Sequence, residues 1–155
     1  MGTTAKSLVL TPILFPKPCD VVREISSMAR TTKTALLVED NPTVREATFH
    51  VLVELGFTVC EADCAAAAIQ ATQHQQFDFV LTDISMPGGM SGVDLAKHLR
   101  KLYPGLPIVL VTGFSNLLEE VAGEFVVLKK PYQINELRLA IDLEIQMTTK
   151  ATKSH

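Results

Sequence analysis

The side chains that could do chemistry in this 155-residue chain stand where apolar runs end; they are Glu39, Asp40, Asp83, Thr112 and Lys130. Carboxylates bind hard divalent cations, and an aspartate can also act as a nucleophile. Lysine adds a compact positive charge on a flexible stem. If the fold brings these residues together, they could hold a metal ion and an anionic group side by side.

Short apolar runs alternate with segments of helical periodicity along most of the chain. We expect strands at 35–38, 57–60, 77–81, 107–111 and 125–128, and helices at about 42–55, 65–74, 92–102, 115–121 and from 134 onward. The runs are apolar on both faces, which is typical of strands buried in a parallel sheet. The alternation predicts an α/β fold with helices on both faces of the sheet, joined by right-handed crossovers.

In an open α/β sheet, ligands bind outside the carboxyl ends of the strands. The polar residues at the strand ends should therefore converge on one crevice. Asp78 is a different case, because it precedes Asp83 by five positions. At ~3.3 Å per residue, the two lie roughly 16 Å apart along a strand. We expect Asp78 at the opposite edge, in a structural role.

Three clustered carboxylates repel one another by about 4 kcal/mol per pair at ~4 Å and an effective dielectric near 20. A divalent cation removes this conflict, and an all-oxygen site suits Mg²⁺, with Mn²⁺ as the other possibility. Lys130 supplies further positive charge. The set is suited to a phosphoryl group beside a metal, and a carboxylate could take that group as an acyl phosphate.

Four pieces of the sequence, in order and each at a strand end, resemble the receiver domains of response regulators in two-component signalling. They are Leu-Leu-Val-Glu-Asp-Asn (36–41), Leu-Thr-Asp-Ile-Ser-Met-Pro (81–87), Val-Thr-Gly (111–113) and Leu-Lys-Lys-Pro-Tyr (128–132). The resemblance covers about residues 34–147. It implies a flavodoxin-like (βα)5 fold whose five-stranded parallel sheet has the order 2-1-3-4-5.

The resemblance implies a role for each matching residue. Asp83 corresponds to the phosphoacceptor, and Glu39 and Asp40 to the acidic pair, with Asp40 favoured as the direct metal ligand. Together with Asp83, the backbone carbonyl of Ser85 completes the implied Mg²⁺ site.

Two further positions complete the implied site. Thr112 corresponds to the switch hydroxyl and Lys130 to the lysine that contacts the phosphoryl group. Lys129 is the rival for that role, but strand alternation points it the other way.

The sequence departs from the family's pattern at two places. Gly92 stands nine residues after Asp83, one more than is commonest, and this variant is most like receivers attached to hybrid histidine kinases. Val127 occupies the position of the family's aromatic switch residue, and the helix between Thr112 and Lys130 is short. These departures put the family's aromatic rotation in question for this chain.

The resemblance implies Mg²⁺-dependent transfer of a phosphoryl group to Asp83 from a histidine kinase or a histidine phosphotransfer protein. Slow self-dephosphorylation would follow, with no activity on a separate substrate. The alternative is a receiver-like interaction module that is not phosphorylated. A metal-dependent phosphatase is less favoured, because Ser85 stands where a second acid is needed. A dimer through the face between the fourth and fifth helices of the fold is a further possibility.

Residues 33–148 form the expected receiver domain, which leaves 1–32 as an extension or linker with a possible helix and 149–155 as a disordered tail. Residues 13–18 resemble 127–131, so the first segment could be the remnant of a preceding receiver; an upstream linker helix or a non-native extension is the plainer interpretation. We therefore expect no DNA-binding or enzymatic output domain after residue 148.

The net charge of −3 argues against direct binding of nucleic acid, which needs clustered positive charge. No apolar stretch reaches the ~18 residues of a membrane span, and the Ser7–Phe15 stretch lacks a signal-peptide cleavage site. We therefore expect a cytoplasmic protein without membrane contact.

Overall fold

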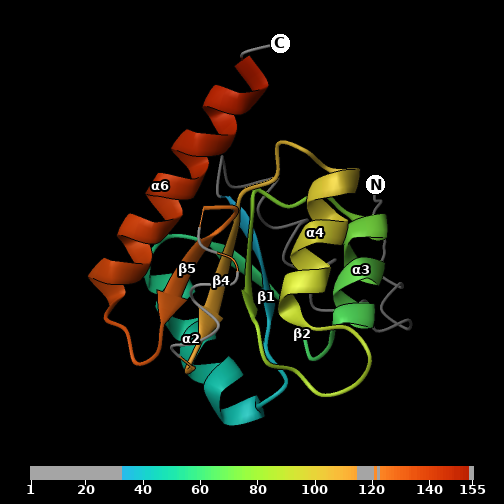
Figure 1. Cartoon of the computed structure of the whole chain (residues 1–155). Helices are drawn as coiled ribbons and strands as arrows, with labels where there is room; N and C mark the ends of the chain where they lie inside the picture. The colour runs from blue at the N-terminus through green and yellow to red at the C-terminus, as the bar shows by residue number, and fades with distance from the viewer. Residues whose placement is uncertain (1–32, 115–120, 122, 154–155) are drawn as a thin grey trace, which may run out of the picture.

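A five-stranded parallel sheet forms the centre of the computed structural model, which describes residues 33–114, 121 and 123–153 (Figure 1). The strands are β1 (Thr34–Val38), β2 (Thr58–Ala62), β3 (Phe79–Asp83), β4 (Ile108–Thr112) and β5 (Val126–Lys129). Their order is β2-β1-β3-β4-β5, and every neighbouring pair is parallel. The expected fold class and strand order are confirmed.

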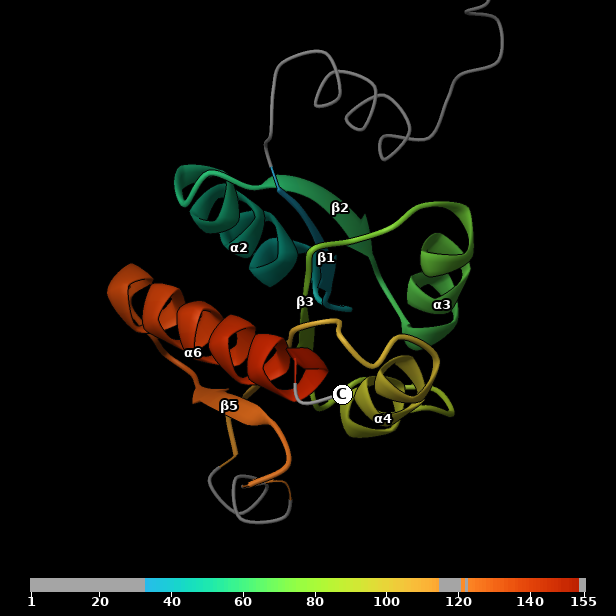
Figure 2. The same ribbon diagram turned by 90° about the horizontal axis from the view of Figure 1, so that it is seen from above.

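Helices cover both faces of the sheet, as Figure 2 shows from above. They are α2 (Pro42–Glu54), α3 (Ala65–His74), α4 (Gly92–Leu102) and α6 (Ile134–Lys153). α2 and α6 lie on one face, and α3 and α4 on the other (Figures 1 and 2). Apart from Val121, the short helix expected at 115–121 lies outside the described residues, as does everything expected of 1–32.

Two apolar layers hold the helices to the sheet, because successive residues of a strand point to opposite faces. Leu36 and Leu110 are fully buried in the layer beneath α3 and α4. Leu37 and Val109 are buried in the layer beneath α2 and α6. Each such side chain contributes about 1.5–3 kcal/mol by leaving water. The site at the sheet edge is therefore carried by a rigid support.

Local capping fixes where the helices beside the carboxyl edge begin. The side chain of Asn41 accepts hydrogen bonds from the N–H groups of Thr43 and Val44, so α2 starts as soon as β1 ends. Ser91 and Asp94 form a reciprocal capping box at the start of α4. Such caps satisfy N–H groups that a helix leaves without internal partners.

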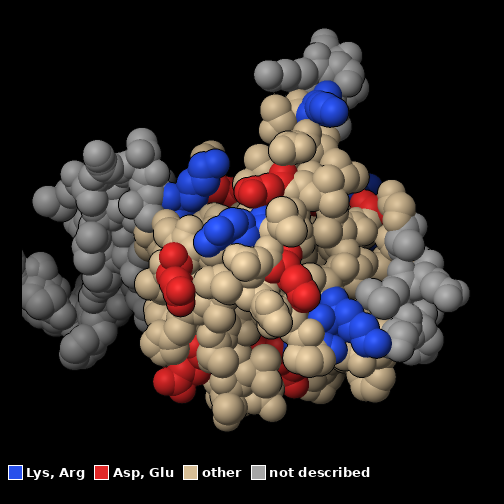
Figure 3. Space-filling view, turned by 90° about the vertical axis from the view of Figure 1, so that its left-hand side faces the viewer, with Lys and Arg blue, Asp and Glu red and all other residues tan. Residues whose placement is uncertain are grey.

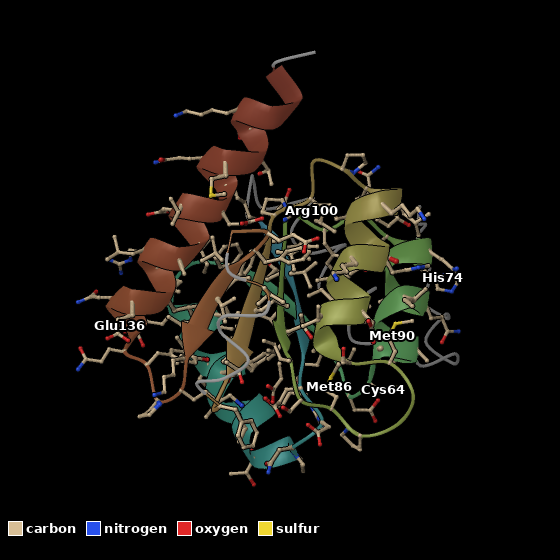
Figure 4. All side chains as sticks on the ribbon, viewed as in Figure 1. Cys64, His74, Met86, Met90, Arg100 and Glu136 are labelled. Atoms are coloured by element: carbon tan, nitrogen blue, oxygen red, sulfur yellow. The ribbon has the colours of Figure 1, made fainter. Side chains whose placement is uncertain are left out.

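A buried ion pair closes the opposite, amino edge of the sheet. Glu144 of α6 is 1% exposed and contacts Arg100 of α4, which also lies 4.6 Å from the centre of the Phe125 ring (Figure 4). Glu144 also accepts a hydrogen bond from the N–H of Ile108. Burial raises the pKa of this carboxyl, although Arg100 and the N–H of Ile108 oppose the rise. The pair ties α6 to α4 across the end of the sheet.

α6 extends to Lys153, whereas the sequence places a tail from residue 149 onward. No glycine or proline interrupts residues 134–153. The hydroxyl of buried Thr148 donates to the carbonyl of Glu144, which satisfies this polar group within the helix. In the part of the chain that the structure describes, no helix has the length and apolar character needed to cross a membrane.

Gly92, the first residue of α4, lies against the backbone that follows the end of β3. Its N–H donates to the carbonyl of Ile84 at 2.9 Å. A Cβ atom at position 92 would lie 1.9 Å from the carbonyl oxygen of Asp83, which is backbone and cannot swing aside. A side chain here would therefore displace the segment that carries Asp83.

We expect Gly92→Ala to lower the free energy of unfolding by about 1–3 kcal/mol, the usual cost of overpacking. Gly89→Ala is the matched control, because a Cβ there meets nothing within 4 Å and the change should stay within about 0.5 kcal/mol. Urea unfolding followed by circular dichroism measures both. Equal stabilities for the two variants would contradict the close approach.

Candidate functional site

Three carboxylates meet at the carboxyl edge of the sheet. Glu39 and Asp40 follow β1 directly, and Asp83 is the last residue of the neighbouring strand β3. One oxygen from each carboxylate lies within 4.8 Å of the others. The structure thus brings together the three acids that the sequence singled out, although 44 positions separate Glu39 from Asp83.

Lys130 reaches this cluster from the far side, just past the end of β5. Its Nζ lies 3.2 Å from Oε1 of Glu39 and 3.1 Å from Oδ2 of Asp83. Its backbone N–H donates to the carbonyl of Thr112 at 2.8 Å, which fixes the start of its side chain. Lys129 is exposed, so strand alternation distinguishes the two lysines as expected.

Glu39 is the more deeply placed member of the acidic pair, with 5% of its surface exposed. Burial raises the pKa of its carboxyl; the N–H of Asn41 and the ammonium of Lys130 oppose the rise, and the charge of Asp83 adds to it. The carbonyl of Glu39 accepts a hydrogen bond from Arg45 at 2.8 Å. That contact holds the turn between β1 and α2.

At Lys130, in contrast to Glu39, the neighbouring charges together have a larger effect on the pKa than burial does. Burial alone would lower the pKa of its ammonium, but the charges of Asp83 and Glu39 outweigh burial and raise it. Behind Lys130, burial raises the pKa of the Tyr132 hydroxyl, an effect that a hydrogen bond with Thr48 opposes. Lys130 is therefore charged at neutral pH and offsets part of the negative charge of the two acids.

Thr112 ends β4, the strand next to β3, and its side chain is fully buried. Its hydroxyl oxygen accepts a hydrogen bond from the N–H of Phe114 at 3.0 Å. Ser85 lies on the other side, where its N–H points to Oδ1 of Asp83 at 3.3 Å. The two predicted site residues thus flank the carboxylate from the strand and from the following loop.

The surface beside Asp83 is hollowed, although Asp83 itself is only 9% exposed. The hollow measures about 720 Å³ and is lined by the loop after β3 and the first turns of α4, including Ser85, Val93 and Lys97. In Figure 4, Met86 and Met90 mark the course of this loop. The hollow therefore reaches the loop that directly follows Asp83.

The structure also places residues that the sequence left outside the site or did not single out. Asp78 lies at the amino edge, where it accepts from the N–H of Thr34 at 2.8 Å, so its structural role is confirmed. Val127 is partly buried against the layer beneath α3 and α4. Sequence reasoning missed Arg45 and the exposed ring of Phe114 at the rim of the site. A basic residue in the first turn after the acidic pair was the available signal for Arg45.

The donor set at this edge fits a magnesium ion. Hard cations of this size prefer carboxylate and carbonyl oxygens, and they retain several waters. Two carboxylates are nearly buried and one is partly exposed, so an ion could be held from one side and hydrated on the other. The single ammonium of Lys130 does not neutralise three carboxylates. Glu39, Asp40, Asp83 and the carbonyl of Ser85 are the residues that would hold the ion.

Comparison with known proteins identifies the class to which this fold and edge belong. A sequence model of the response regulator receiver domain matches residues 35–142, and the chain belongs to this family. It is a response regulator receiver domain of two-component systems. Response regulator receiver protein CpdR of Brucella abortus is 33% identical over 109 residues, which cover 68% of this chain and 90% of CpdR.

Other relatives are longer than this chain. The probable transcriptional regulatory protein TcrX of Mycobacterium tuberculosis is 31% identical over 125 residues, covering 77% of this chain and 52% of TcrX. The DNA-binding transcriptional regulator NtrC of Escherichia coli is 32% identical over 104 residues, covering 64% of this chain and 22% of NtrC. The chain therefore spans only part of several relatives that it matches.

Solved structures agree with the fold. The response regulator protein TrrA of Thermotoga maritima, in complex with Mg²⁺ and BeF, has a TM-score of 0.66 at 27% identity. The match covers 72% of this chain and 98% of the TrrA chain. A receiver protein from Sinorhizobium medicae has a TM-score of 0.69 at 26% identity, with coverages of 76% and 98%.

We expect Lys130→Met to lower the free energy of unfolding by about 1–3 kcal/mol at pH 7, because it leaves two nearly buried carboxylates without their counter-charge. Lys129→Met is the matched control on the exposed side of the strand and should change stability by less than about 0.5 kcal/mol. Urea unfolding at several pH values measures both effects.

The contribution of Lys130 to the free energy of unfolding should change with pH in a defined direction. The folded pKa of Lys130 is raised above 10.5, so its contribution is complete below that pH and is lost as pH rises through the folded value. The difference between wild type and Lys130→Met should also shrink in acid, where Glu39, whose pKa burial raises, becomes protonated. A difference that stays constant from pH 4 to pH 11 contradicts this electrostatic account.

Proposed function

We propose that this receiver domain accepts a phosphoryl group on Asp83 in a Mg²⁺-dependent reaction and acts as a switch in two-component phosphorelay signalling. The observation that carries the proposal is the convergence of Glu39, Asp40, Asp83 and Lys130 at one edge of the sheet. This is the donor set that phosphoryl transfer needs, because that reaction depends on positioning and charge neutralisation.

The donor would be the phosphohistidine of a histidine kinase or of a histidine phosphotransfer protein. A carboxylate oxygen of Asp83 attacks phosphorus, a P–O bond forms, the P–N bond breaks and the imidazole leaves with the electron pair. Lys130 already lies 3.1 Å from Oδ2 of Asp83 and would stay beside the added phosphoryl oxygens. When bound, magnesium supplies neutralisation of the charge on those oxygens.

Thr112 would complete the switch. Its hydroxyl is bonded to the N–H of Phe114, and a phosphoryl group on Asp83 offers a stronger, charged acceptor on the neighbouring strand. A shift of Thr112 toward that group would pull on the segment that begins at Gly113. The output would then be read by protein contact or by onward phosphotransfer. NtrC and TcrX are regulators of transcription by their names, and the chain spans only part of each.

The test is phosphorylation by a small phosphodonor. Wild-type protein incubated with Mg²⁺ and acetyl phosphate should gain the mass of one phosphoryl group, and Asp83→Asn should gain none. Asp78→Asn is the matched control, because this aspartate lies only five positions before Asp83 in the sequence but at the opposite edge of the sheet. Intact-protein mass spectrometry, with and without chelation of Mg²⁺, measures the gain.

The proposal is contradicted if the wild-type protein gains no mass with acetyl phosphate and also accepts no phosphoryl group from a phosphohistidine donor. The alternative is then a receiver-like interaction module, which Val127 at the aromatic position favours. Equal labelling of wild type and Asp83→Asn would place the modification on another residue.

A further inference from the structure

A second hollow, of about 520 Å³, lies at the amino edge of the sheet, at the opposite end from Asp83. It is lined by Thr72 and residues 75–78, at the end of α3 and in the loop that follows, and by residues 102–107, at the end of α4 and in its loop. We call it the amino-edge pocket. Its volume falls in the range of ~300–1,000 Å³ that is usual for small-molecule sites.

Apolar and aromatic side chains form much of the wall of the amino-edge pocket. Phe77 and Tyr103 are half-buried, and the hydroxyl of Tyr103 donates to the carbonyl of Thr72 at 3.4 Å, which links the two loops. Pro104 and Pro107 restrict the backbone of the segment that leads into β4, because the proline ring locks φ. The walls are therefore formed before any ligand arrives.

One polar side chain of this wall lacks a partner. Gln75 is 6% exposed, and its side-chain oxygen Oε1 is buried with no hydrogen-bond partner among the described residues. Such acceptors are rare, because a buried hydrogen bond left unmade destabilises the fold. The backbone N–H of Gln75 already donates to the carbonyl of Ala71 at 3.1 Å. The terminal torsion of glutamine is soft, so Oε1 can turn to a donor placed in the pocket.

The other polar groups of the amino-edge pocket also favour a positive ligand. Asp78 is the one charged side chain among the described residues that line it, and its carboxylate is exposed at the rim, where it accepts from the N–H of Thr34 at 2.8 Å. α3 and α4 lie side by side and both end here (Figures 1 and 2). The C-terminal end of a helix carries a partial negative charge.

Basic side chains do not cancel this negative character inside the pocket. The last turns of α3 and α4 contain His74, Arg100 and Lys101, but none of the three is among the lining residues, and Arg100 is paired with Glu144. On the face that carries α6, in contrast, basic and acidic side chains lie among one another (Figure 3). The amino-edge pocket therefore selects for a cation that can donate hydrogen bonds.

We propose that the amino-edge pocket binds a small organic cation, an amidinium or a guanidinium on a flat apolar body. Its N–H groups donate to Oε1 of Gln75 and to the carboxylate of Asp78, and its flat body lies against Phe77 and Tyr103. A planar fork of N–H donors suits two acceptors, and aromatic faces attract cations. The pocket is at the opposite edge from Asp83, so the inference does not depend on the proposed phosphorylation.

Titration of the ¹⁵N-labelled full chain with benzamidine, followed by backbone NMR, tests the site. We expect saturable shifts at the amides of Gln75, Asp78 and Tyr103, with a dissociation constant of about 1 mM or tighter for a ligand of this size. Benzamide has a similar shape without the charge and should bind at least about fivefold more weakly, because charge-assisted hydrogen bonds are stronger. Benzoate carries the opposite charge and should not bind.

Gln75→Leu removes the unpartnered oxygen at similar side-chain volume. The variant should be at least as stable as wild type, because no buried acceptor is left unpaired, and should bind benzamidine at least about tenfold more weakly. Gln73→Leu is the matched control, the same change at an exposed position of α3 outside the lining, and should leave binding unchanged. Asp78→Asn keeps an acceptor for the N–H of Thr34 but removes the charge, and should weaken binding by about threefold.

The inference is overturned if benzamidine at about 10 mM leaves the amides around the amino-edge pocket unmoved, or shifts only those around the acidic cluster at the carboxyl edge. It is also overturned if benzoate binds as well as benzamidine, or if Gln75→Leu keeps the affinity of wild type. Thermal melting checks that each variant is folded. If Gln75→Leu is not, Asp78→Asn and the comparison of the three ligands decide the result.

Discussion

Repulsion among carboxylates is the constraint on which the carboxyl edge of this receiver domain depends. Glu39, Asp40 and Asp83 place three negative charges within a few ångströms, and an unscreened pair at ~4 Å costs about 4 kcal/mol at an effective dielectric near 20. Lys130 contacts two of the three and offsets part of that cost. The remainder makes the edge attractive to a divalent cation, and it adds to the burial that raises the pKa of Glu39.

The parallel sheet makes this concentration of charge possible. All five strands point the same way, so residues far apart in the sequence end at one edge, and the buried layers on both faces hold the strand ends in register. At the amino edge of the sheet, the charged groups are paired. There the Arg100–Glu144 pair and the contact between Asp78 and Thr34 close the fold. One edge is stabilised for support and the other retains unbalanced charge for chemistry.

The sheet and the acidic cluster could be predicted from the sequence because both follow from local patterns. Apolar runs define strands, and a polar residue that ends each run must lie at the carboxyl edge of a parallel sheet. Alternation along β5 also distinguished Lys130 from Lys129. The position of Gly92 could be noted from spacing alone, but its reason, close approach to the carbonyl of Asp83, is visible only in the folded chain.

Other features depend on contacts between distant residues and carry no local signal. Arg100 and Glu144 look like ordinary helix-surface charges until the fold buries Glu144 and brings Arg100 to it across the end of the sheet. Arg45 bonds a backbone carbonyl, which any residue could offer. The end of α6 at Lys153 was missed because a polar segment can be helix or tail, and continuation of the preceding turns decides which.

Backbone NMR of ¹⁵N-labelled protein, titrated first with Mg²⁺ and then with beryllium fluoride as a phosphoryl mimic, tests the central claim most directly. The account predicts that Mg²⁺ shifts amides around Glu39, Asp83 and Ser85, and that the mimic then extends the shifts to Thr112 and Lys130. Saturating Mg²⁺ that leaves these amides unmoved, or shifts confined to the amino edge, would contradict it.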